Sequence, residues 1–129
     1  MNIEIDNLKK DLINFSESSL GREVCGFILE EEGDLVLKKL ENKSNHNDLF
    51  IIEPIDFLQA KLSGKLVSIF HSHTTGSEKA SKYDIKNAEN CLYPYLIYAL
   101  DTEKFYLFDK PYFERSKECV NKLKGILDD

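Results

Sequence analysis

The alternation of hydrophobic and polar residues starts with a helical period and then changes to the period of a β-strand. Apolar residues at helical spacing predict an amphipathic helix near the start of the chain: Ile5, Leu8, Leu12 and Phe15. Its end is expected within the serine-rich residues 16–21. Residues 24–29 form an apolar run, and residues 35–39 alternate after a turn at residues 32–34, so the two runs predict a β-hairpin. Glu23 would then lie at the start of its first strand.

The rest of the chain continues this mixture of patterns. Strands are predicted at residues 49–52, 66–70, 95–100 and 104–108. Helices are predicted at residues 54–62, where Pro54 suits the first turn, and at residues 81–91. A terminal helix would have one apolar side: Phe113, Val120, Leu123 and Leu127. Without an internal repeat or a linker, this order of elements predicts one mixed α/β domain over residues 1–129.

Two histidines directly follow the apolar run at residues 66–70. One residue separates His71 from His73, so in a strand their side chains project to the same side, close enough to hold one ion. Seven residues lie between His73 and Ser81, and two more lie between Ser81 and Asp84. Asp84 can provide a third ligand, an anionic oxygen, which leaves the fourth position of Zn2+ open for water. The spacing therefore predicts a catalytic zinc site.

Ser81 also has a purely structural interpretation. A Ser-x-x-Asp sequence at the start of a helix is typical of a capping box, in which Ser81 accepts a hydrogen bond from the Asp84 amide. The two interpretations are compatible, because capping would also orient Asp84. The histidine pair favours a metal, since burying two imidazoles and a carboxylate without a cation would cost several kcal/mol. His46 lies in a polar loop and is interpreted as a surface residue without a role.

With Glu23-Val24-Cys25-Gly26 upstream, the array resembles the signature of the JAMM (MPN+) metalloprotease family: an upstream Glu, then H-[ST]-H, seven residues, Ser, two residues and Asp. The resemblance covers about residues 23–110. It implies a single MPN domain of the cytidine-deaminase-like type, with a curved mixed β-sheet flanked by helices. Family members often have proline where this chain has Thr74 and Ala80. The loop between these residues is therefore expected to be less constrained.

The resemblance also assigns roles to the motif. It implies that His71, His73 and Asp84 bind one zinc ion, that Glu23 acts as general base and then as general acid, and that Ser81 helps to stabilise the tetrahedral intermediate. A carboxylate suits the role of Glu23, because amide hydrolysis needs a proton for the departing amine as well as an activated water. The sequences typical of zinc deaminases and of zincins do not occur in this chain.

Composition limits the classes of partner and the cellular compartment that are expected for this chain. The net charge of −6 disfavours binding to a nucleic-acid backbone. No apolar run approaches the roughly 20 residues that span a bilayer, and the N-terminal residues lack a signal-peptide pattern. The three cysteines have no C-x-x-C pairing, so a reducing, cytoplasmic location is expected, in the host cytoplasm or the virion if the gene belongs to a phage. Cys25 is interpreted as a buried structural thiol, although it could approach the metal.

The leading functional hypothesis is a zinc-dependent metallopeptidase or isopeptidase that hydrolyses an amide bond with metal-activated water. By resemblance, its substrate would be a protein or peptide, such as a ubiquitin-like protein, a sulfur carrier with a Gly-Gly end, or a phage tail-assembly protein. The alternatives are a non-catalytic MPN-type interaction module and a structural component of a phage tail tip.

The substrate is expected to be a flexible peptide or a Gly-rich tail. Only ten residues separate Asp84 from Tyr95, which leaves no room for an insertion that grips a second ubiquitin. An exposed strand edge near Leu49-Phe50-Ile51 could pair with an extended tail instead.

Overall fold

A computed structural model describes residues 3–19, 21–114 and 117–127 of the chain. Leu20, within the expected end of the first helix, lies outside the described residues, as do both ends of the predicted domain. The elements follow in this order: α1 (Ile3–Glu17), β1 (Cys25–Glu31), β2 (Asp34–Leu40), α2 (Pro54–Leu62), β3 (Leu66–His73), α3 (Lys82–Cys91), β4 (Tyr95–Ala99), β5 (Lys104–Phe108) and α4 (Lys117–Leu127). No helix among them is long and apolar enough to cross a membrane.

The strands form one mixed sheet in the order β2-β1-β3-β4-β5. The pairing of β3 with β4 is parallel, and the other pairings are antiparallel. The parallel pair needs a crossover connection, and α3 supplies it. β3 is the central strand, and all eight of its residues are buried, as its continuous apolar run predicts. The predicted α/β class with a mixed sheet is confirmed.

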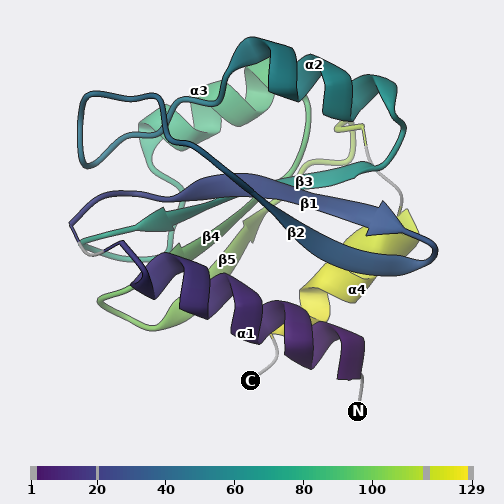
Figure 1. Cartoon of the computed structure of the whole chain (residues 1–129), viewed down its shortest axis with the longest axis horizontal. Coiled ribbons are helices and arrows are strands. Elements are labelled where there is room, and N and C mark those ends of the chain that lie inside the picture. The colour runs from purple at the N-terminus through teal and green to yellow at the C-terminus, as the bar shows by residue number, and fades with distance from the viewer. Residues whose placement is uncertain (1–2, 20, 115–116, 128–129) are drawn as a thin grey trace.

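Helices cover both faces of the sheet, with α1 and α4 on one face and α2 and α3 on the other (Figure 1). Each face has its own apolar cluster. The first includes Leu12 from α1, Phe70 from β3 and Leu123 from α4. The second includes Ile69 from β3 and Ala88 from α3. Because neighbouring residues of β3 point to opposite faces, the odd-numbered positions from Ile69 onward face α2 and α3.

The hairpin of β1 and β2 requires a glycine at position 26. A Cβ atom added to Gly26 would lie only 2.5 Å from the backbone oxygen of Lys38 on β2. The close approach keeps β1 paired with both β2 and β3, where Cys25 lies opposite His71. The glycine of the Glu-x-x-Gly motif is therefore a packing requirement of the sheet beneath the candidate site.

Two predicted elements differ from the structure. Residues 49–52 do not form a strand: the side chain of Asn42 accepts a hydrogen bond from the Ile51 amide and donates one to the Leu49 carbonyl. Because these backbone groups are already hydrogen-bonded, the expectation that residues 49–51 offer a free strand edge to a substrate tail is wrong. In the terminal helix, Phe113 precedes α4 and packs against Phe108 instead.

In α4, Val120 and Leu123 are buried as predicted, but the last buried position differs by one residue from the predicted one. Ile126 is buried, whereas the predicted Leu127 is 37% exposed. Both are apolar residues at neighbouring positions, so helical spacing alone could not decide which of the two faces the core.

Candidate metal centre

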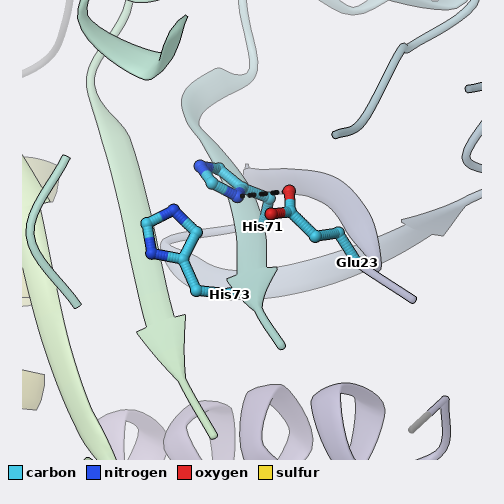
Figure 2. Close-up of side chains that lie close together, drawn as sticks. All are labelled: Glu23, His71 and His73. Carbon is cyan, nitrogen blue, oxygen red and sulfur yellow. Dashed lines mark ion pairs between the residues drawn. The ribbon is translucent and has the colours of Figure 1, made fainter. Parts of the chain in front are cut away.

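The last residues of β3 bring two imidazoles together on the face that α2 and α3 cover. The ring centroids of His71 and His73 lie 5.0 Å apart, and Figure 2 shows both rings beside the central strand. Ser72 has the opposite orientation, and its hydroxyl accepts a hydrogen bond from the backbone N–H of Val24. The alternation of side chains along β3 therefore separates the two candidate ligands from the residue that fastens β3 to the segment before β1.

The start of α3 brings Asp84 to both histidines. Oδ1 of Asp84 lies 3.0 Å from Nε2 of His71, and Oδ2 lies 2.9 Å from Nε2 of His73. The predicted capping box is present: Ser81 Oγ accepts from the Asp84 amide at 3.1 Å, and the Ser81 amide donates to Asp84 Oδ2 at 3.0 Å. The cap thus fixes the carboxylate between the two imidazoles, and the structural interpretation of Ser81 is correct without excluding a role in the site.

Glu23 approaches His71 from the other ring nitrogen. Its Oε1 lies 3.3 Å from Nδ1 of His71, and only 6% of the residue is exposed (Figure 2). Glu23 lies two residues before β1 rather than at the start of that strand. The loop that follows β2 holds it in place: the Glu23 amide donates to the Asn47 carbonyl, and Asn42 donates to the Glu23 carbonyl, both at 2.9 Å. Sequence reasoning considered this Asn-rich loop only as part of a region for substrate recognition and did not predict that it holds Glu23.

The remaining ring nitrogen of His73 has a backbone partner. Nδ1 of His73 lies 2.8 Å from the carbonyl oxygen of Ser77, so it is the nitrogen that carries the proton. Nε2 faces Oδ2 of Asp84 at 2.9 Å and can donate to it only when the ring is protonated. When that proton leaves, the lone pair of Nε2 is available to an ion, and a ring whose other nitrogen donates to a backbone carbonyl is usual for a metal-binding histidine. A partner for this ring could not be predicted from the motif, because Ser77 contributes through its backbone.

The electrostatics of the site favour a positive charge. Burial opposes the charged form of His71, yet the nearby carboxylates of Asp84 and Glu23 raise its pKa to about 9. The pKa of His73 is raised despite its burial, by Asp84 and by the Ser77 carbonyl. Burial would raise the pKa of the Asp84 carboxyl, but the two histidines lower it well below its ordinary value. The carboxylates therefore attract either protons or a metal cation to the imidazoles.

The donor atoms fit a zinc ion. Nε2 of His71 is buried and has no hydrogen-bond partner within the described residues, although Oδ1 of Asp84 lies 3.0 Å away. Such an unsatisfied buried nitrogen is costly unless it binds an ion. Glu23, His71 and His73 each place one ligand atom within 4.8 Å of the others. Two imidazoles and a carboxylate oxygen are typical ligands of catalytic zinc, so these three residues could hold the ion. Asp84, the predicted third ligand, is not in this group, although its carboxylate oxygens lie 2.9–3.0 Å from Nε2 of the two histidines.

A cavity of about 360 Å3 opens onto the site and gives it access from solvent. Among the residues that line it are Glu23, His73, Ser81 and Asp84. His71 is not in the lining, and the ring of Phe50 stacks on it with a centroid distance of 4.4 Å. Phe50 is therefore a wall of the site that sequence reasoning missed, having placed it in a strand edge.

Residues 7–109 of the chain match the family described as prokaryotic homologs of the JAB domain. The chain belongs to this family. The predicted family is thus confirmed, and the match contains every residue of the candidate site. The solution structure of protein DSY2949 from Desulfitobacterium hafniense is similar to this JAB-family domain, with a TM-score of 0.63 and 20% identity over 85% of this chain and 86% of that one. That likeness supports the fold. Comparison with curated proteins finds no significant match.

Two other residues of this JAB-family domain, Cys25 and His46, are not among the residues grouped as possible metal ligands. Cys25 is fully buried, and burial followed by the charge of Glu23 raises the pKa of its thiol to about 12. The thiol donates a weak hydrogen bond to the Glu41 carbonyl at 3.9 Å, which favours the structural interpretation of Cys25. His46 is exposed in the loop after β2, where its backbone amide donates to Ser44, and it contributes no ligand atom.

Proposed function

We propose that this JAB-family domain is a zinc-dependent metallopeptidase that hydrolyses an amide or isopeptide bond. One observation carries the proposal: two buried imidazoles and two buried carboxylates lie together, and all of them except His71 line a cavity that is open to solvent. Family membership supports the fold and the type of site. The four chemical groups named above for zinc binding and proton transfer are all present, which favours an enzyme over a non-catalytic interaction module or a purely structural phage tail-tip component.

Bound zinc supplies a Lewis acid that makes water a stronger nucleophile near neutral pH and polarises a carbonyl. Glu23 lines the cavity, so its carboxylate can accept a proton from the attacking water and return it to the leaving amine. The Ser81 hydroxyl accepts from the Asp84 amide, and its hydrogen remains free to be donated to an oxygen that becomes negative in the cavity. Phe50 excludes water from the side of His71.

The proposed substrate is a flexible peptide or the Gly-rich tail of a ubiquitin-like or phage tail protein. Small and polar side chains form much of the cavity wall: Thr74, Thr75, Ser77 and Ala80. α3 ends at Cys91 and β4 begins at Tyr95, so no insertion is available there to hold a second folded ubiquitin. Since residues 49–51 offer no strand edge, the tail would be held by the walls of the cavity.

Metal analysis and peptide cleavage together test the proposal. The protein, purified without chelators, is expected to contain one zinc per chain and to cleave members of a quenched peptide library and a Gly-Gly-linked fusion. A chelator should abolish cleavage, and added zinc should restore it. Absence of stoichiometric metal, or cleavage that survives complete chelation, would refute the function. Cleavage of one ubiquitin-chain linkage without any peptide cleavage would refute only the proposed substrate class.

A further inference from the structure

The segment between His73 and Ser81 is fastened to the turn between β4 and β5. The Gly76 amide donates to Oδ2 of Asp101 at 2.9 Å. Two residues further on, Oε1 of Glu78 accepts a hydrogen bond from the Thr102 hydroxyl, also at 2.9 Å. The sequence predicted a less constrained loop here because it lacks prolines, but the structure shows two cross-links to a neighbouring turn.

The residue between these two cross-links is the one that orients His73. Ser77 follows Gly76 and precedes Glu78, and its carbonyl oxygen accepts from Nδ1 of His73 at 2.8 Å. At the start of the loop, the carbonyl of His73 accepts from the Leu100 amide at 3.0 Å. Both ends of the hydrogen bond that fixes the imidazole are therefore held by the end of β4 and its turn.

We propose that Asp101 and Thr102 are positioning residues for the metal centre, acting through the loop on the orientation of His73. The inference rests on the proposed zinc site and adds two residues that lie outside the motif. Removing their side-chain oxygens would release Gly76, which has a φ of +84° and, as a glycine, can adopt many other backbone conformations. The Ser77 carbonyl would then move with it. His73 would then lose its fixed tautomer and direction, so Nε2 would point at the ion for a smaller fraction of the time.

The two cross-links contribute little to global stability, which separates positioning from a structural role. Asp101 and Thr102 are exposed, and exposed hydrogen bonds stabilise folded proteins by only about 1 kcal/mol or less. Partners of metal-binding histidines, in contrast, typically change metal affinity by about 10- to 100-fold. Asp101 and Thr102 do not contact His73 but act on it through the loop that carries Ser77. A smaller loss, of about 3- to 10-fold in zinc affinity, is therefore expected from removing both side-chain oxygens.

The test compares zinc affinity among variants of the full chain, by competition with a chromophoric chelator. Asp101→Ala combined with Thr102→Val should weaken zinc binding by about 3- to 10-fold, while the urea midpoint of the zinc-free protein stays close to that of wild type. Asp101→Asn combined with Thr102→Ser keeps both oxygens and should bind within about twofold of wild type. Glu103→Gln, which removes an equal charge from the same turn, is the matched control and should also bind like wild type.

Hydrogen exchange supplies a second readout that needs no metal. The Gly76 amide should exchange faster in the Asp101→Ala/Thr102→Val variant and at the wild-type rate in the conservative pair. Wild-type zinc affinity in the Ala/Val variant would overturn the inference, as would an equal loss in the conservative pair or in Glu103→Gln. If the wild-type protein itself binds no zinc, the proposed function fails and the inference fails with it; zinc binding that is insensitive to the loop variants refutes the inference alone.

Discussion

Replacement of Glu23 by glutamine tests whether its carboxylate transfers protons at the candidate metal centre or only orients His71. The carboxylate contacts Nδ1 of His71 and lines the cavity, so Glu23 can transfer protons or merely orient the imidazole. An amide has nearly the same shape and can still accept a hydrogen bond from His71, but it cannot carry the proton. Glu23→Gln therefore removes proton transfer while leaving the orienting contact available.

The structure predicts that this change is selective for turnover. The backbone of Glu23 is held by the Asn47 carbonyl and by the Asn42 side chain, and neither bond involves the carboxylate. Stability should consequently change by at most about 1 kcal/mol. A general acid–base group contributes about 10²- to 10⁴-fold to the rate, so the barrier should rise by roughly 3–5 kcal/mol. Zinc should remain stoichiometric, because Asp84 and both Nε2 atoms are unchanged.

The assay measures kcat on the best substrate from the peptide library, together with zinc content and melting temperature. Asp48→Asn is the matched control, since Asp48 is an exposed acid that lines the same cavity and is not among the residues that contact either histidine. It should retain most of the activity. Turnover of Glu23→Gln within a few-fold of wild type would refute proton transfer by Glu23. Loss of zinc from Glu23→Gln would show instead that the carboxylate orients or binds at the metal site.

Three further outcomes are expected. His73→Ala should lose stoichiometric zinc by elemental analysis while His46→Ala, a change at an exposed loop histidine, keeps it; equal zinc in both variants would contradict the ligand assignment. Ser81→Ala should lower the melting temperature by about 4 °C, because one capping interaction contributes about 1 kcal/mol, and an unchanged melting temperature would contradict the capping box. Gly26→Ala should destabilise the protein by about 1–3 kcal/mol in urea unfolding, since its Cβ would lie 2.5 Å from the Lys38 oxygen; wild-type stability would show that β2 can move away.

Much of the fold could be predicted from local patterns because the period of side chains records which face is buried. Helical spacing located α1, and the uninterrupted apolar run located the central strand β3. The same rule placed His71 and His73 on one face, and the Ser-x-x-Asp sequence located the start of α3 with its capping box. These features depend on residues close in the chain, so the sequence determines them almost alone.

Local patterns were insufficient where distant residues compete for the same backbone groups. The segment at residues 49–52 has the composition of a strand, but the Asn42 side chain forms hydrogen bonds with its backbone. Phe50 packs on His71 rather than lying at a strand edge. No spacing rule contains that information, because it depends on how the loop after β2 folds against β3.

The sequence by itself determined which chemical groups this JAB-family domain brings to its site: two imidazoles at alternate positions and a carboxylate at the first turn of the next helix. Only the tertiary structure decided how these groups are held. Glu23 reaches His71 because β1 pairs with β3, and His73 is oriented by Ser77 in a loop that Asp101 fastens to the sheet. The physical reason is that ligand identity resides in side chains, whereas ligand direction depends on backbone hydrogen bonds between segments far apart in the chain.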